Sequence, residues 1–329
     1  MHARPARVRH RCCLAELRPN SRLPLRLASL GYALLKHAGV TTVARRLRSG
    51  GLVLCYHNIV PGTASSCGVW GRLGLHMPVA AFARQMRWLA DTHDVIPLER
   101  LVDRLAARES LRGTAAVTFD DAYGGVFEHA WPLLQALHIP ATVFVVADAP
   151  DTGADYWWDH PAVLRAYSPE AERRWLSDLH GDRAAIVKSV SPNGKGGAEG
   201  ASRPPEFCRP ATWRTIAGAA RSGLHLGAHS ATHRVLATLD AAELEREVSG
   251  SRAEIARHTG VTPACFAYPY GHWSEPVRQA VRAAGYRAAF SLDRTRKRGA
   301  VDLWTIPRLN VPATIGDAAF EAWTAGLRP

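Results

Sequence analysis

Two adjacent carboxylates, Asp120 and Asp121, follow a short apolar run in this 329-residue chain. Residues 115–119 are rich in strand-forming side chains, so they predict a buried strand that ends at the two aspartates. Neighbouring side chains on a strand point to opposite faces, but a turn at the strand end would bring both carboxylates into one cleft. By itself, such a pair is more typical of a turn or a helix N-cap than of a catalytic site.

Two imidazoles stand four residues apart, at His229 and His233, after a second predicted strand at residues 224–228. On a helical turn this spacing places both rings on one side, as in a clamp for a divalent metal. Two imidazoles and one carboxylate form the donor set of a catalytic zinc-type site that keeps one position open for water. The pattern therefore predicts a metal at Asp121, His229 and His233, and it leaves Asp120 free to act as a base.

The elements that must position these groups alternate regularly from Gly51 onward. Alternating strands and helices at this spacing predict parallel βα units, and hence a barrel or a doubly wound sheet. Such folds place their chemistry at the carboxyl ends of the strands, where the aspartates, His229 and His57 all stand. We expect strands at residues 52–56, 95–96, 115–121, 141–147, 224–228, 264–267, 286–292 and 305–311, and helices at 78–89, 98–107, 127–137, 213–221, 241–258 and 275–284.

An insertion at about residues 151–210 interrupts this alternation. It opens with Trp157 and Trp158, has helical character near residues 169–179, and includes a Gly-, Ser- and Pro-rich stretch at 192–205 that predicts a mobile loop. We interpret it as an excursion from a single domain at 51–329, preceded by a basic leader at 1–50.

The net charge of +12 is concentrated in the leader. Residues 1–50 contain eleven Lys and Arg and one Glu, whereas residues 51–329 contain the remaining 30 basic and 28 acidic residues. A nearly neutral body does not support a groove for a phosphate backbone, so nucleic acid is excluded as a partner. The six cysteines form no CxxC pair, which excludes a zinc knuckle or redox motif of that type.

Leucines recur at helical spacing in the leader, with Arg22, Arg26 and Lys36 between them. Two interpretations remain open, a basic amphipathic helix that contacts an anionic membrane and a partly disordered leader. The longest uncharged run, residues 27–35, is too short to span a bilayer, and no signal cleavage site follows it. We expect a cytoplasmic protein or one peripheral to the inner membrane, with export left open.

Three motifs resemble those of the polysaccharide deacetylases (NodB-homology domain, carbohydrate esterase family 4). Residues 118–121 (TFDD) and 229–233 (HSATH) are similar to the first two motifs, and residues 266–271 (FAYPYG) to the third. The resemblance covers roughly residues 51–311 and implies a distorted (β/α) barrel of about seven strands. It also implies that Asp120 is the general base, that Asp121, His229 and His233 bind the metal, and that the backbone N–H of Tyr270 helps to hold the oxyanion.

Two departures from the family pattern concern the charged groups. The Arg that usually stands two residues before the Pro of the third motif is Ala267 here, and Arg308 is the candidate to replace its charge next to Asp120. The usual C-terminal Leu-x-x-His, which supplies the general acid, is missing. The poly-N-acetylglucosamine deacetylases carry their acid in an early Tyr-His pair instead, which the pair at residues 56–57 resembles, so His57 is the candidate acid.

The resemblance implies metal-dependent removal of N-acetyl groups from an amino-sugar polymer or oligomer, with zinc as the expected ion. Residues expected to contact the N-acetylated carbohydrate are Tyr123, Trp158, Trp304 and Arg308. Two alternatives remain, a non-catalytic glycan-binding protein on the same fold and a deacetylase of a monomeric or lipid-linked sugar. The sequence leaves the oligomeric state open.

Overall fold

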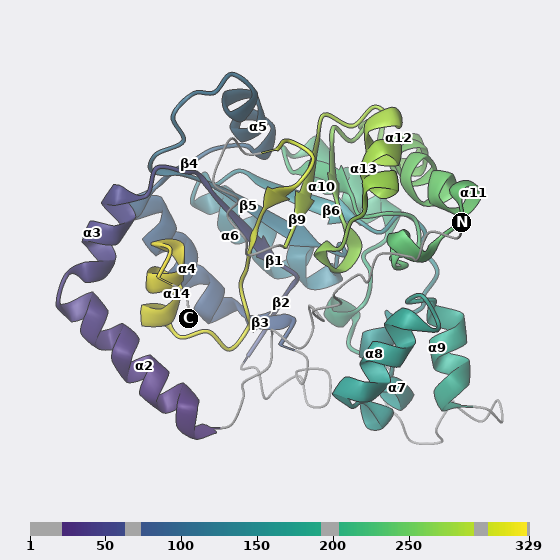
Figure 1. Cartoon of the computed structure of the whole chain (residues 1–329), viewed down its shortest axis with the longest axis horizontal. Helices are drawn as coiled ribbons and strands as arrows, with labels where there is room; N and C mark the ends of the chain where they lie inside the picture. The colour runs from purple at the N-terminus through teal and green to yellow at the C-terminus, as the bar shows by residue number, and fades with distance from the viewer. Residues whose placement is uncertain (1–21, 63–73, 192–203, 293–301, 328–329) are drawn as a thin grey trace, which may run out of the picture.

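A parallel sheet of nine strands forms the centre of the protein (Figure 1). The computed structural model describes residues 22–62, 74–191, 204–292 and 302–327. Eight strands follow one another in the order β10-β9-β8-β7-β6-β5-β1-β11, and β4 pairs with β5 off this path. Their bounds are β1 Leu52–Tyr56, β4 Asp94–Val95, β5 Thr114–Asp120, β6 Ala141–Val145, β7 His225–Ala228, β8 Cys265–Ala267, β9 Ala288–Ser291, β10 Ile306–Pro307 and β11 Leu309–Asn310.

The two edges of this sheet, β10 and β11, are consecutive in the chain and are separated only by Arg308. The backbone N–H of Arg308 donates to the carbonyl of Ser291 at 3.0 Å, and that of Val311 donates to the carbonyl of Cys55 at 2.9 Å. The chain thus crosses from one edge to the other, and the sheet becomes a nearly closed barrel. The predicted distorted (β/α) barrel is confirmed, with eight strands along its path instead of about seven.

The strands are buried on both faces, as expected for a parallel sheet covered by helices. In β1, Leu52 and Leu54 belong to the larger hydrophobic cluster, whereas Val53 between them belongs to a second cluster that also draws on β5, β6, β8 and β9. This division follows the alternation of side chains along a strand. Because both faces of the strands are buried, the strands are continuous apolar runs in the sequence.

Helices alternate with the strands as the periodicity predicts. Two of the predicted helical stretches contain π-helical segments, at Val126–Ala130 and Arg246–Gly250. The predicted strand at 305–311 is two short strands, and a small parallel sheet of β2 (Asn58–Val60) and β3 (His76–Pro78) was not predicted. The helices of the barrel are α4 Val79–Thr92, α5 Leu98–Ala106, α6 Trp131–Ala136, α10 Trp213–Arg221, α11 Ala241–Glu245, α12 Ser251–Thr259, α13 Glu275–Ala283 and α14 Asp317–Thr324.

The insertion forms three short helices, α7 (Pro161–Ala166), α8 (Pro169–Ser177) and α9 (Arg183–Val190), at the lower right of Figure 1. Side chains at all three helix starts accept backbone N–H groups, His160 for α7, Ser168 for α8 and Asp182 for α9, which stabilises these ends. A 3₁₀ turn at Trp157–Asp159 precedes the helices. The predicted loop at 192–205 lies mostly outside the described residues.

Two helices precede the barrel, α2 (Arg22–His37) and α3 (Val40–Leu47), along the left edge of Figure 1. Gly39 joins them with a φ of 72°, a left-handed conformation that glycine adopts without strain. The pair packs against α14, where Lys36 forms an ion pair with Glu321 at 2.7 Å. Within the described residues, no helix has the length and apolar content needed to cross a bilayer.

Candidate active site

Asp120 and Asp121 both line one cavity at the carboxyl end of β5. The strand ends at Asp120, and the next two residues adopt left-handed backbone conformations, with φ of 72° at Asp121 and 56° at Ala122. This turn is why two neighbouring side chains reach the same space, as the sequence predicted. Non-glycine residues hold such conformations at a cost of order 1–3 kcal/mol each, and they cluster at functional sites.

Residues 229–233 form a tight loop after β7, and the expected helical turn is wrong. Ser230 and His233 have positive φ angles of 63° and 60°. The N–H groups of the loop bond to side chains instead of to the preceding turn of a helix: that of His233 donates to Ser230 Oγ at 2.9 Å, and that of Thr232 donates to Glu247 Oε2 at 2.9 Å. The loop nevertheless brings the two imidazoles together, with ring centroids 4.8 Å apart.

Asp121, His229 and His233 form a compact donor set for a divalent cation. Asp121 Oδ1 lies 3.7 Å from His229 Nε2 and 3.6 Å from His233 Nε2, and the three donor atoms lie within 4.8 Å of one another. His229 Nδ1 is 2.7 Å from the carbonyl of Ala267 and donates to it, which leaves Nε2 as a lone-pair donor toward the carboxylate. Two imidazoles and a carboxylate match the ligands that zinc takes in catalytic sites.

The electrostatics of this donor set also fit a cation. Asp121 Oδ1 is buried and has no hydrogen-bond partner among the described residues, although a buried polar atom is normally paired. Burial, together with the charges of Asp120 and Asp159, raises the pKa of Asp121 well above its usual range. Burial lowers the pKa of both His229 and His233, which keeps the rings in the neutral form that binds metal. A cation at this point would satisfy the orphaned oxygen.

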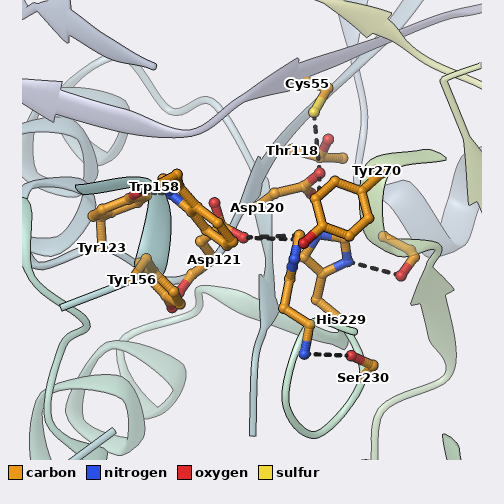
Figure 2. A network of polar contacts seen from close by, with 12 residues as sticks. Cys55, Thr118, Asp120, Asp121, Tyr123, Tyr156, Trp158, His229, Ser230 and Tyr270 are labelled. Carbon is orange, nitrogen blue, oxygen red and sulfur yellow. Dashed lines mark hydrogen bonds and ion pairs between the residues drawn. The ribbon is translucent and has the colours of Figure 1, made fainter. Parts of the chain in front are cut away.

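Asp120 is held separately from the donor set by a buried guanidinium. Arg308 Nη1 donates to Asp120 Oδ1 at 2.6 Å, and Nη2 donates to Oδ2 at 2.7 Å. Cys55 Sγ also donates to Oδ2, at 3.3 Å, as Figure 2 shows. Burial alone would raise the pKa of Asp120, but the charge and hydrogen bonds of Arg308, together with the nearby His229 and His57, outweigh burial and hold this pKa well below its usual range. The carboxylate is therefore ionised, and it lies next to the donor set.

His57 follows β1 and lines the same cavity. One of its ring nitrogens lies within 4.8 Å of a carboxylate oxygen of Asp120. Burial lowers the pKa of His57 to about 4, although the charge of Asp120 acts in the opposite direction. The free side chain is thus neutral at pH 7.

Aromatic rings form part of the cavity wall around His233. The ring of Trp158 lies 4.7 Å from that of His233, and the ring of Tyr270 lies 4.6 Å from it, both edge to face. Tyr270 has a φ of 58°, so the main chain turns sharply at the third motif. The remaining wall residues, which the sequence did not single out, are Leu75, Leu292 and Asn310. Only Asn310 carried a usable signal, because it is a polar residue near the end of the last predicted strand.

Tyr123 lies behind Trp158 and is not on the cavity wall (Figure 2). Its hydroxyl accepts a hydrogen bond from Trp158 Nε1 at 2.7 Å and donates to Asp159. Asp159 also pairs with His76 at 3.0 Å, and both of these side chains are fully buried. Tyr123 is therefore placed to hold Trp158 in position.

Trp304 also lies away from the cavity wall. It is half-buried against the larger hydrophobic cluster, and its carbonyl accepts a hydrogen bond from Tyr268. Of the four residues expected to contact carbohydrate, Trp158 lines the cavity, Arg308 holds Asp120, and Tyr123 and Trp304 are placed elsewhere.

Comparisons with known proteins agree with this geometry. The family model described as polysaccharide deacetylase matches residues 107–289. No curated protein sequence matches the chain.

Among solved structures, the deacetylase PplD from Streptococcus pyogenes is 15% identical with a TM-score of 0.58, and the alignment covers 84% of this chain and 98% of that one. IcaB from Ammonifex degensii is 22% identical with a TM-score of 0.57 and the same coverage, 84% and 98%. A de-N-acetylase from Aggregatibacter actinomycetemcomitans is 17% identical with a TM-score of 0.56, and the alignment covers 83% and 99%. At these identities the structural matches show a shared fold.

Proposed function

This chain belongs to the polysaccharide deacetylase family, and we propose that it hydrolyses N-acetyl groups of an amino-sugar polysaccharide or oligosaccharide, of the chitooligosaccharide or poly-N-acetylglucosamine type, and releases acetate. One observation carries the proposal: an Asp-His-His donor set and a second, separately held carboxylate open into one cavity. The named relatives support it, since PplD is a deacetylase solved with acetate and the Aggregatibacter protein is a de-N-acetylase.

The proposal includes a divalent cation, with zinc as the expected ion. Asp121, His229 and His233 would hold it, because their donor atoms converge and Asp121 Oδ1 is otherwise unpaired within the described residues. When bound, a divalent ion supplies Lewis acidity, which lowers the pKa of water and stabilises negative charge on a carbonyl oxygen.

Asp120 acts as the base in this proposal. Its carboxylate accepts a proton from the water that attacks the acetyl carbonyl, and Arg308 keeps the carboxylate ionised before the reaction. The backbone N–H of Tyr270 stabilises the negative oxygen of the tetrahedral intermediate. Removing one such donor from an enzyme typically costs about 2.7–4 kcal/mol of transition-state stabilisation.

His57 protonates the leaving nitrogen, because an amine leaves readily only when it is protonated. Its pKa of about 4 makes the ring neutral at the start, so it must take up a proton during the reaction. Asp120 supplies that proton: its low pKa makes transfer to His57 favourable, and a carboxylate oxygen lies within 4.8 Å of a ring nitrogen. The C–N bond then breaks, and acetate and a free amino sugar leave.

Acetate release by the purified protein tests the proposal. The substrates are chitooligosaccharides, poly-N-acetylglucosamine, monomeric N-acetylglucosamine and a lipid-linked N-acetylated sugar, each assayed with chelator and after zinc is restored. We expect acetate from a polymer or oligomer, loss of activity with chelator, and a decrease in kcat of about 10²–10⁴-fold in Asp120→Asn. Acetate only from a monomeric or lipid-linked sugar would contradict the substrate class. Bound zinc without acetate from any substrate, and no effect of Asp120→Asn, would instead favour the non-catalytic glycan-binding alternative.

A further inference from the structure

Large exposed hydrophobic side chains are concentrated on α2 and α3. Within the described part of the chain six such residues are exposed, and five of them are on these two helices. The sixth, Val261, is 37% exposed and lies after α12. Contiguous exposed apolar surface on a soluble domain marks an interaction site, whereas a single exposed residue does not. The five residues, which we call the aliphatic stripe, are Leu30 (61%), Leu34 (69%), Val40 (40%), Val43 (57%) and Leu47 (72%).

On α2 the stripe points away from the barrel. Tyr32 accepts a hydrogen bond from Trp323 Nε1 at 3.0 Å, and Lys36 pairs with Glu321, so these two residues define the inner side of the helix. Leu34 is two positions from both residues and Leu30 is two positions from Tyr32, so at 100° per residue both leucines lie on the opposite side. The inner side of α2 is therefore occupied by α14, whereas Leu30 and Leu34 on its outer side are exposed.

On α3 the arrangement is the same. Arg45 Nη1 donates to the carbonyl of Thr92 at 3.0 Å, and the Arg45 guanidinium lies 5.8 Å from the centroid of the Trp88 ring. Val43 and Leu47 are two residues away on either side of Arg45 and face outward. The barrel thus holds both helices by their inner sides and leaves the aliphatic stripe exposed.

The charged side chains of the segment that forms α2 and α3 are all of one sign. From Arg22 to Arg48 the chain has six basic residues and no acidic residue. A second copy of this chain would bring the same positive charge against itself, which disfavours self-association through this face. An anionic partner would complement it. Aliphatic side chains flanked by Arg and Lys on a surface helix are typical of helices that lie in the plane of a membrane interface.

We propose that α2 and α3 form a docking surface for an anionic lipid bilayer. The aliphatic stripe enters the boundary between headgroups and acyl chains, and the net positive charge of the helix pair attracts the lipid phosphates. The helix pair lies parallel to the membrane and does not cross it. This inference is independent of the proposed reaction, since the site residues take no part in it.

Vesicle binding by the full chain tests the proposal. Co-sedimentation is measured with vesicles of phosphatidylcholine alone and of phosphatidylcholine mixed with phosphatidylglycerol, at low and high salt. The test variant is Leu34→Glu/Leu47→Glu, which places charge on two exposed positions of the stripe. The matched control is Val261→Glu, which makes the same kind of change at the exposed apolar residue outside the stripe. Thermal unfolding of each variant checks that the fold is kept.

We expect wild type and Val261→Glu to bind the phosphatidylglycerol vesicles, with binding weakened by salt and nearly absent on phosphatidylcholine alone. The stripe variant should bind at least about tenfold more weakly, because two apolar contacts are lost and two anionic charges are added. Equal vesicle binding by wild type and the stripe variant would overturn the proposal. So would a wild-type dimer that the stripe variant converts to a monomer without any wild-type vesicle binding, which would make a second copy the partner.

Discussion

Arg308 and Asp120 are joined by two parallel N–H···O contacts, Nη1 to Oδ1 at 2.6 Å and Nη2 to Oδ2 at 2.7 Å. Arg308 is also the one residue between β10 and β11, the two edges of the barrel. The same short segment therefore closes the barrel and delivers the counter-charge to the candidate base. Because the Arg expected in the third motif is Ala267, the structure places this charge on a strand end much later in the chain.

Replacing Arg308 should change the pH dependence of activity. In Arg308→Met the burial of Asp120 is no longer offset by a cation, so the pKa of Asp120 rises. The acidic limb of the kcat/KM profile should then move to higher pH. Arg308→Lys keeps the charge but loses the paired geometry, so its shift should be smaller. Profiles of acetate release for the three proteins check this, and an unmoved acidic limb in Arg308→Met would contradict the role assigned to the ion pair.

Replacing His57 should slow the hydrolysis of amides much more than the hydrolysis of aryl esters. We expect His57→Gln to lower kcat for acetate release by about 10²–10⁴-fold, because the leaving nitrogen loses its proton donor. Bound zinc should be unchanged, since His57 is outside the Asp121, His229 and His233 set. An aryl acetate, whose leaving group needs no proton, serves as the control substrate and should be cleaved at nearly the wild-type rate. Equal losses on both substrates would contradict an acid role.

Glu247 should control zinc affinity without touching the ion. Its Oε2 accepts the N–H groups of Ala231 at 3.0 Å and Thr232 at 2.9 Å, between the two histidines of the loop. Groups that orient metal ligands typically contribute about 10–100-fold in affinity or activity. Glu247→Ala should therefore weaken zinc binding by a factor in this range, measured by competition with a chromogenic chelator. The matched control is Glu245→Ala, an exposed position on α11, which should bind zinc as wild type does.

Stability should depend on pH through the ion pair of His225 and Glu99, at the opposite end of β7 from the site. His225 Nδ1 lies 3.2 Å from Glu99 Oε2. Glu99 raises the pKa of His225 above 6.5, and His225 lowers the pKa of Glu99 below 4.5, although burial opposes this second shift. Because the pKa of His225 is raised in the folded protein, the ion pair stabilises the fold fully below pH 6.5. That stabilisation is lost as the pH rises through the pKa of His225 in the folded protein. Because the pKa of Glu99 is lowered in the folded protein, its contribution to stability is present above pH 4.5. That contribution is lost as the pH falls through the pKa of Glu99 in the folded protein.

The ion pair of His225 and Glu99 should therefore contribute most to the free energy of unfolding between pH 4.5 and 6.5. His225→Gln should be less stable than wild type by up to about 1 kcal/mol in this window, as expected for a partly exposed pair. The difference should shrink by pH 8.5. Urea unfolding at several pH values measures it, and a difference that stays constant with pH would show that the pair has no such role.

The sequence by itself determined most strands and helices of the barrel and the three residues of the candidate donor set. Apolar runs of strand length and helices of period 3.6 are local patterns, and the predicted strand at 52–56 agrees with β1 residue for residue. Asp121 and His229 were identifiable because each follows a strand end, and His233 because it stands four residues after His229; parallel strands bring their carboxyl ends to one edge.

Only the tertiary structure decided which distant groups act on these residues. Arg308 and Asp120 are 188 positions apart, and their contact depends on how the barrel closes. The loop at 229–233 is not a helical turn because Glu247, from a later helix, accepts its N–H groups. Tyr123 and Trp304 matched a sugar site by residue type, yet packing placed both off the cavity wall. Residue type and spacing are local properties, whereas a hydrogen bond or a wall position depends on the closed arrangement of the whole chain.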